Sequence, residues 1–528
     1  MKVKTAFVAA MLLCGVAGQA QPLDSLWQTP PQDSRPWNFW YWMYGAFTRE
    51  GITADLEAMK GNGLAGAYQF TIRGVPNPPH IEPSYNQLTP EWWDIWSYAV
   101  READRLGLQL SFNACDGWAV AGGPWITPEM SMQVVTSSET TLKGGSKVKV
   151  KLPQPPSNRD YYRDIATFAY PSRPGDGINS RDLRPRITSD RGRDLSFLND
   201  PGNTTPLNSG KPCHIDMAFD EPFTVRSIFI RPRNCNYQAL RMIMQVSDDG
   251  VNYRDVVRMT PPRIGWYSWI VPGFTYAVPE TTSRYFRFVN DPSGGEVMDE
   301  DNDKSKAFEY FSILEINLQS YTQIDQYESK NGEAWRVASA TPKDLVGRKD
   351  CVPRRKLINI SEYVSEDGTL EWDAPSGDWT ILRMGYTTNG AENRPAGGAI
   401  GLECDRFNPD AVRLQMESWI GHLREIVGPE VFGRVVKYVH VDSWECGSQN
   451  WSPVFREAFR QRKGYDIVDV LPVMAGLPVQ SVEYTENVLR DVRETISQLI
   501  SDVFFRQISE YGTVSAALSA AKPWRRSR

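Results

Sequence analysis

The order of strand-like and helix-like segments constrains the fold of this 528-residue chain more than any other feature. Through the first part of the chain, strands alternate with helices and short links join them. This alternation is typical of a parallel sheet with crossover helices, either doubly wound or closed into a barrel. A barrel is favoured because aromatic and polar residues gather after the C-terminal ends of the predicted strands. Strands are predicted at 37–48, 64–70 and 108–115, and amphipathic helices at 50–63 and 89–107.

The middle of the chain has the pattern of an all-β region. From residue 133 to 385, short period-2 strands are joined by turns such as Asp249-Gly250, and no strong helix pattern appears until about residue 409. Helical periodicity then resumes, and the apolar segment 435–441 is predicted to be the fourth strand of the first sheet. We therefore expect an α/β fold of the (β/α)8 barrel type, with a β-rich insertion after the third strand.

The N-terminus has the parts of a secretory signal peptide. The basic start MKVK precedes the apolar run TAFVAAMLLCGVAG, and the small residues Gly18 and Ala20 are placed for cleavage. We expect residues 1–20 to be removed and the mature chain to be exported to the periplasm or the medium. Because Cys14 follows Leu13 rather than Gly or Ala, a lipid anchor is not expected.

Charge and aromatic content narrow the class of partner. The 64 acidic and 58 basic residues give a net charge of −6 and are spread without long runs, which argues against a nucleic-acid groove. With 41% hydrophobic and 23% charged residues, the composition is globular and leaves no room for several membrane spans. The 18 tryptophans favour a glycan partner, because exposed indoles stack on sugar rings; core packing is the alternative for each of them.

The strand predicted at 435–441 ends in the cluster HVDSWE, which contains Asp442, Trp444 and Glu445. Barrels of this kind place their catalytic groups at the C-terminal ends of their strands. A carboxylate there is suited to act as general acid or base toward a glycosidic oxygen or a water, and Trp444 offers an apolar wall and a platform for a sugar. A structural role for Glu445 is the alternative. His440 is expected to be a packed histidine rather than a catalytic base.

Further binding candidates lie on or after two of the other strands. Asn113, Asp116 and Trp118 are placed to hydrogen-bond a sugar or to help hold a metal, and helix capping is the alternative for Asp116. Trp42 belongs to the first strand and its exit, and it is a candidate for substrate contact with core packing as the alternative.

Four segments match a known family: RPWNFWYWMYGAFTREGITADLEAMKGNGLAGA, DGWAVAGGPWITPEMSMQ, ENRPAGGAIGLECDRFN and HVDSWE. Together they resemble glycoside hydrolase family 106, the α-L-rhamnosidases common in gut Bacteroidetes. The resemblance implies an exo-acting hydrolase with a (β/α)8 catalytic domain, an inserted β-sandwich, an inverting mechanism and a calcium ion that touches the sugar hydroxyls. It implies that Glu445 is one of two catalytic carboxylates. We assign Glu445 as general acid, with general base as the alternative.

A second resemblance concerns the β-rich insertion. The strands of HIDMAFDEPFTVRSIFIRPR and MIMQVSDDGVNYRDV, within residues 180–320, resemble the discoidin-like, galactose-binding jelly roll attached to many glycoside hydrolases. This resemblance implies either a sugar-binding or a structural module. The predicted division is 1–20 signal peptide, 21–132 first part of the barrel, 133–385 inserted β-sandwich region, 386–512 continuation of the barrel and 513–528 atypical tail.

The implied calcium ion needs oxygen ligands. The segment ENRPAGGAIGLECDRFN returns from the insertion to the barrel and carries Arg394, Glu403 and Asp405. Hard carboxylate oxygens suit calcium, so Glu403 and Asp405 are candidate ligands. No EF-hand loop occurs in the sequence, and the ligands are therefore expected to come from distant loops.

The end of the sequence departs from the family pattern. About four of the eight expected βα units are recognisable, and residues 513–528 are small and basic without a strand pattern. Inversion needs two carboxyl groups about 6.5–9.5 Å apart, and the second, expected on a later strand, has no counterpart here. The predicted function is an exported α-L-rhamnosidase, truncated at its C-terminus, that releases terminal α-L-rhamnosyl residues from plant or other glycans. The alternative is a non-catalytic carbohydrate-binding protein or an inactive fragment.

Overall fold

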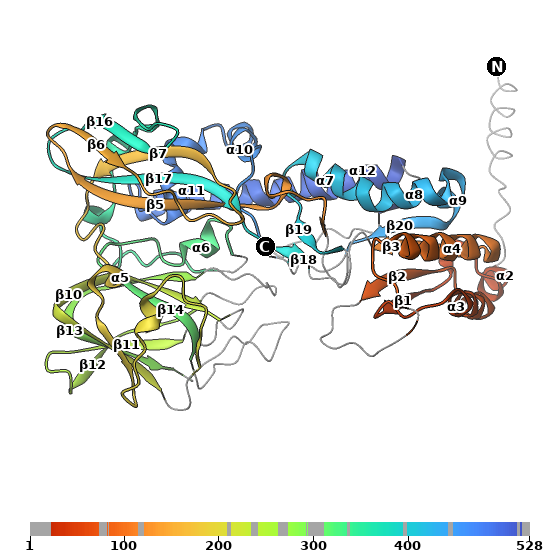
Figure 1. The fold of residues 1–528 in the computed structure, drawn as a ribbon, viewed down its shortest axis with the longest axis horizontal. Coiled ribbons are helices and arrows are strands. Elements are labelled where there is room, and N and C mark those ends of the chain that lie inside the picture. Colours follow the sequence, from red (N-terminus) through yellow and green to blue (C-terminus); the bar gives the residue numbers. More distant parts are fainter. Residues whose placement is uncertain are drawn as a thin grey trace, which may run out of the picture.

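The structure is a computed structural model that describes residues 23–72, 82, 84–113, 121–208, 213–233, 241–261, 273–291, 293, 311–334, 338–393, 399–441, 447–514 and 518–519. Figure 1 shows an elongated molecule, with a parallel sheet and its helices at one end and two antiparallel β units at the other. Within these residues, no helix combines the length and the apolar character that crossing a membrane requires.

Five parallel strands form the sheet at one end, in the order β1-β2-β3-β20-β21. Each neighbouring pair is parallel, and the strand order follows the chain order without reversal. The four strands predicted from the apolar segments are confirmed, including the fourth strand, which pairs with the third across the long intervening region. The bounds are β1 Trp37–Met43, β2 Gly66–Ile72, β3 Gln109–Asn113, β20 Val436–His440 and β21 Leu518–Ser519.

Helix α4 (Pro90–Leu106) shows how the local sequence sets the helix boundaries. Thr89 caps the N-terminus by accepting a hydrogen bond from the Trp92 N–H, and Pro90 occupies the first turn, where a missing N–H costs nothing. Gly107 ends the helix in the left-handed conformation, at φ 66°. The other helices at this end are α2 (Leu23–Gln28), α3 (Arg49–Gly61), α7 (Pro409–Met416), α8 (His422–Val427) and α9 (Pro429–Val435).

The two faces of the parallel sheet differ. One face joins α3, α4, α7, α8 and α9 in a single core, to which β1 contributes Trp42 and β3 contributes Phe112. On the opposite face, Phe39 and Tyr41 of β1 are 54% and 43% exposed. These five helices therefore cover the same side of the sheet, and the side that bears Phe39 and Tyr41 is an open aromatic face.

The first antiparallel unit is built on two long strands. β5 (Gln133–Lys143) pairs with β17 (Asp378–Thr388) along its whole length, and the sheet order is β15-β7-β17-β5. Its remaining strands are β7 (Arg163–Pro171) and β15 (Ile358–Asn359), and a separate two-stranded sheet pairs β6 (Lys147–Lys151) with β16 (Thr369–Asp373).

The second antiparallel unit has a hydrophobic core of its own, centred on residues such as Ile228, Phe286 and Phe288. Asp249 accepts hydrogen bonds from the N–H groups of Val251 and Asn252, so it is the turn residue that the sequence predicts. The strands are β8 (Arg186–Ser189), β9 (Leu207–Asn208), β10 (His214–Pro232), β11 (Met242–Ser247), β12 (Tyr253–Met259), β13 (Phe274–Asn290) and β14 (Ser312–Gln319), with short helices α5 (Ser180–Leu183) and α6 (Tyr327–Lys330) before and after them.

The path of the chain after β20 differs from the prediction that 386–512 simply continues the barrel. Helices α10 (Phe455–Lys463) and α11 (Val482–Leu499), with the 3-10 helix η10 (Ile467–Ala475), join β7 and β17 in one core, and Figure 1 places α10 and α11 beside these strands. Their apolar sides thus cover the first antiparallel unit. The chain returns through the π-helical segment η11 (Ile500–Phe505) to α12 (Arg506–Val514), whose Ile508 reaches the core of the parallel sheet.

Candidate active site at the ends of the parallel strands

Asn113 and His440 are the last residues of β3 and β20, and they are register partners across these two strands. In a parallel sheet the C-terminal ends of adjacent strands meet at one edge, which is where α/β folds bind their ligands. Asn113, a predicted substrate contact, is buried at this edge. The sequence therefore placed Asn113 at the correct end of the sheet, and its contact with a sugar stays a prediction.

His440 is packed among aromatic rings. Its ring meets Phe70 edge-on at a centroid distance of 4.6 Å and lies 5.8 Å from Tyr68. Tyr68 and Phe70 in turn contact Phe39, so His440 belongs to the open aromatic face. A packed histidine was predicted at this position, and the ring contacts confirm it.

Several predicted site residues lie outside the described residues. They are Asp116, Trp118, Arg394, Asp442, Trp444 and Glu445. The described chain reaches Val441 directly after β20 and continues from Gly447. The roles assigned to these residues therefore stay predictions.

The segment that follows the predicted catalytic cluster is buried and fixed by hydrogen bonds. Asn450 accepts a hydrogen bond from the Val135 N–H at 2.8 Å and donates its own N–H to the Gln133 carbonyl at 3.1 Å. Ser448 donates its hydroxyl to the Glu333 carbonyl at 2.6 Å, and its carbonyl accepts from the Asn389 amide at 2.9 Å. The start of β5 and the end of β17 thus fix the chain just beyond residue 446.

Asp405, a predicted calcium ligand, is part of the same anchorage. Its carboxylate accepts hydrogen bonds from Ser452 Oγ at 2.5 Å, Gln449 Nε2 at 2.7 Å and the Phe407 N–H at 2.9 Å. Burial raises the pKa of Asp405 to about 6, and the hydrogen bonds from Ser452 and Gln449 act in the opposite direction. Asp405 therefore binds the polar side chains of the segment 447–453.

Glu403, the second predicted calcium ligand, forms a buried ion pair. Its Oε2 accepts from Arg406 Nη2 at 2.5 Å, and both side chains are shielded from solvent, with exposures of 0% and 1%. The Arg406 guanidinium also lies over the ring of Phe504, 5.4 Å from its centroid. Glu403 ends β19 (Gly401–Glu403), which lies between β18 (Glu392–Asn393) and β4 (Gly122–Gly123) in a small sheet.

Glu403 and Asp405 do not fit a calcium site. Calcium takes 6–8 oxygen ligands, whereas the Asp405 oxygens already accept from three donors and one Glu403 oxygen accepts from a guanidinium. Glu403 Oε1 has no hydrogen-bond partner, but a Cβ atom added at Gly122 would lie only 2.9 Å from it. Among the described residues, no group of three or more His, Cys, Asp or Glu side chains is arranged to hold a metal.

The proposal of Trp42 as a substrate contact requires correction. Its side chain is buried against Trp96 and Phe47, with centroid distances of 5.0 and 4.5 Å, on the face that the helices cover. Strand residues alternate between faces, so Trp42 points to the helices while its neighbour Tyr41 points to the open aromatic face. Core packing, the stated alternative, is correct for Trp42.

Sequence reasoning missed Gln449 and Ser452, which hold Asp405, and Arg406, which pairs with Glu403. A signal was available, because the run GSQNWS places polar residues directly after an apolar strand and before a helix. The partner of that run, however, lies about 45 positions earlier in the chain, and one sequence does not reveal it.

Comparison with known proteins agrees with this arrangement. Residues 28–517 match the glycoside hydrolase 106 family model, described as alpha-L-rhamnosidase. The chain belongs to the glycoside hydrolase 106 family. A family structure, a rhamnosidase from Novosphingobium sp. PP1Y, superposes with a TM-score of 0.76 at 28% identity, over 94% of this chain and 47% of that one.

A curated relative carries a different name. A protein of Formosa agariphila named "Putative beta-glucuronidase" is 27% identical over 485 residues, which cover 92% of this chain and 29% of that protein. This glycoside hydrolase 106 chain therefore spans less than half the length of either relative.

Proposed function

We propose that the chain is the part of an exported α-L-rhamnosidase that carries one catalytic carboxylate, acting on terminal α-L-rhamnosyl residues of glycans with inversion. The family match over residues 28–517 carries this proposal. The register of β3 and β20 supports it, because the segment that contains Glu445 follows the strand beside Asn113. The proposed location is the periplasm or the medium.

In the proposed mechanism, Glu445 protonates the glycosidic oxygen as the bond to the rhamnosyl carbon breaks. A second carboxylate deprotonates a water on the opposite face of the sugar, at the separation of about 6.5–9.5 Å that inversion needs. We place that base on a later strand than β20. Asn113 is proposed to hydrogen-bond a sugar hydroxyl, with Trp444 as an apolar wall beside Glu445 and Asp442, Asp116 and Trp118 as further contacts.

The proposed fold is a (β/α)8 barrel to which the parallel sheet contributes its first strands. A strand order without reversal supports this, because doubly wound sheets reverse their order at a switch point. Helices on one face support it as well, because a barrel carries its helices outside and packs strand side chains inside. Calcium binding stays within the proposal, with ligands other than Glu403 and Asp405.

The test is hydrolysis of aryl glycosides by the wild-type chain and by Glu445→Gln. We expect release of the aryl group from an α-L-rhamnoside but not from a β-D-glucuronide, and loss of that activity in Glu445→Gln. Glu430→Gln, which changes an exposed carboxylate on α9, is the matched control and is expected to keep full activity. Activity on the β-D-glucuronide alone would overturn the substrate assignment, and the anomer released, followed by NMR, tests inversion.

The open aromatic face favours a second candidate, a glycan-binding protein without catalysis. Phe39 and Tyr41 are exposed beside Tyr68 and Phe70, and aromatic rings of this kind stack on the C–H faces of sugars. This candidate predicts that the wild-type chain binds rhamnosylated glycans without turnover. It also predicts that Phe39→Ala weakens binding while Glu445→Gln leaves it unchanged.

A further inference from the structure

A basic segment interrupts the otherwise acidic chain between the two antiparallel units. RKDCVPRRK, residues 348–356, contains five basic residues and one acidic residue, in a chain of net charge −6. It folds into two 3-10 turns, η5 (Arg348–Asp350) and η6 (Arg354–Lys356). Lys349 is neutralised by Glu280, whose carboxylate it meets at 3.0 Å. The three arginines of the segment remain.

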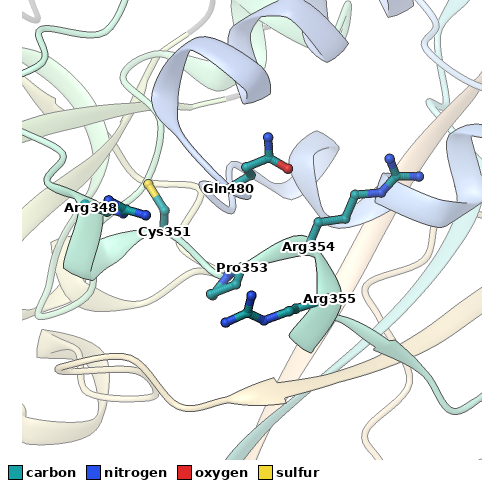
Figure 2. A pocket seen from close by; sticks show the side chains of 6 residues that line it. All are labelled: Arg348, Cys351, Pro353, Arg354, Arg355 and Gln480. Carbon is teal, nitrogen blue, oxygen red and sulfur yellow. The ribbon is translucent and has the colours of Figure 1, made fainter.

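These three arginines line one hollow. Its volume is about 660 Å³, within the range of about 300–1,000 Å³ that small-ligand sites occupy. Figure 2 shows the lining side chains around this open space, with Gln480 entering from the chain that precedes α11. The lining residues are Arg348, Cys351, Pro353, Arg354, Arg355 and Gln480.

The guanidinium groups at the hollow are not neutralised by the described part of the protein. Arg354 approaches Asp469 only to 3.7 Å, and both side chains are about half exposed, so the pair is weak. No carboxylate among the described residues pairs with Arg348 or Arg355. An exposed guanidinium is a strong ligand for a planar anion, because its N–H groups match two oxygens at once.

The backbone that carries these arginines is fixed. Val352 and Gln480 bridge the two sides of the hollow, with Val352 N–H donating to the Pro478 carbonyl at 2.9 Å and Gln480 N–H donating to the Val352 carbonyl at 2.8 Å. Buried Arg173 donates to the Asp350 carbonyl at 3.3 Å, and the Asp350 carboxylate accepts from the Gly347 N–H at 2.8 Å. The charges therefore sit on a rim that needs little ordering when a ligand binds.

Gln480 adds a second unusual feature at the hollow. It has φ 60°, a left-handed conformation that non-glycine residues adopt at a cost of about 1–3 kcal/mol. Its exposed amide lines the hollow, where it offers a hydrogen-bond donor and an acceptor. No aromatic side chain lines the hollow, so it lacks the platform on which neutral sugars stack.

We propose that this hollow binds an anionic segment of a glycan, through carboxylates of uronic acid residues or through sulfate esters. The identification of the ligand as a glycan rests on the proposed function, whereas its negative charge follows from Arg348, Arg354 and Arg355. The hollow thereby selects acidic polysaccharides and holds them to the enzyme outside the site of hydrolysis. A weak, salt-dependent contact of this kind acts by adding to binding elsewhere on the same polymer.

The test compares three oligosaccharides of equal length on the whole chain: an oligogalacturonate, a sulfated oligosaccharide and neutral maltotriose. Titration calorimetry at low salt should detect one of the two anionic ligands and not the neutral one. Arg348→Gln/Arg355→Gln should weaken binding by about tenfold, because two charge-assisted contacts are lost. Arg191→Gln/Arg193→Gln, which removes two exposed arginines that do not line the hollow, is the charge-matched control and should bind like the wild type.

The outcomes are distinct. Equal binding by wild type and Arg348→Gln/Arg355→Gln, or equal weakening in the control, would overturn the proposal. Binding of duplex DNA with the same affinity and the same loss would show a general polyanion surface and would overturn it too. Hydrolysis of the small aryl α-L-rhamnoside should be unchanged in Arg348→Gln/Arg355→Gln. Absence of hydrolysis in every protein, with anion binding intact, would contradict the proposed function and leave the hollow assigned.

Discussion

Ser452 donates a hydrogen bond to Asp405 across 2.5 Å, and this contact joins the loop after β19 to the segment that follows β20. The two residues are 47 positions apart in the sequence and fully buried. Gln449 strengthens the same junction by donating to Asp405 and accepting from the Arg406 N–H. The chain just beyond the predicted catalytic cluster is thus held by a carboxylate rather than by apolar packing alone.

Asp405→Asn should destabilise the protein, because the new amide group faces the Gln449 or Ser452 donors in place of an acceptor. We expect the free energy of unfolding to fall by roughly 1–3 kcal/mol, measured by urea denaturation. Asp410→Asn, at an exposed residue of α7, should change it by less than about 0.5 kcal/mol. Calcium should shift the Tm of Asp405→Asn and wild type equally, and loss of that shift in Asp405→Asn would restore Asp405 as a ligand.

Arg406→Met should be more damaging, because it leaves the Glu403 carboxylate buried without its cation. Removing one partner of a buried ion pair typically costs about 3–5 kcal/mol. The double variant Glu403→Gln/Arg406→Met removes both charges and should regain a large part of that loss. Arg413→Met, at the exposed pair with Asp410, controls for loss of an arginine and should cost less than about 1 kcal/mol. Additive losses in the double variant would contradict the pairing.

Stability should fall as the pH rises from about 4 to about 8. Burial raises the pKa of Asp325 to about 6, of Glu333 to about 7 and of Glu328 to about 8. These pKa values exceed those of an unfolded chain, so the folded state binds more protons across this interval and loses stability as they are released. Urea denaturation at several pH values measures this slope.

Glu328→Gln should flatten that slope, because a neutral amide can accept from Thr275, as Glu328 does at 2.7 and 3.1 Å, without a charge to bury. Glu366→Gln, at an exposed position, should keep the wild-type slope. Carboxyl groups with a lowered pKa, such as Asp164 beside Arg383 and Glu486 beside Lys330, act at lower pH and in the opposite sense. A stability that rises between pH 5 and 8 would contradict the assignment.

Two neighbours on β1 should respond in opposite ways. Trp40 is buried under the helices and donates its indole N–H to Asp55 at 2.9 Å, so Trp40→Ala should cost about 3–5 kcal/mol of unfolding free energy. Phe39 lies on the open aromatic face, so Phe39→Ala should leave stability nearly unchanged. Binding of a hydrophobic dye should fall in Phe39→Ala and Tyr41→Ala. Equal destabilisation by Trp40→Ala and Phe39→Ala would show that both faces are packed.

Local patterns were sufficient to predict the parallel sheet. Alternating apolar strands and amphipathic helices gave β1 to β3, and the caps Thr89 and Gly107 set α4 within one residue. The pairing of β20 with β3 followed because helical periodicity returns immediately before an apolar strand.

The packing partners of helices were not predictable in the same way. The periodicity of α11 shows that one side is apolar, but it does not show that this side meets β7 and β17 rather than the parallel sheet. The role of Asp405 was missed for a related reason, because its donors come from distant positions. Acidic residues near a predicted site suit a metal and a hydrogen-bond anchor equally well in sequence.

The helical path from α11 through η11 to α12 places Leu499 in the core of the first antiparallel unit and Phe504 in the core of the parallel sheet. A π-helical turn holds one more residue than an α-helical turn, and each residue rotates the helix by about 100°. The extra residue therefore acts as a phase shifter, turning the apolar stripe of one continuous helix from one end of the molecule toward the other. Removing a single residue from η11 would leave both stripes intact in composition and out of step in direction.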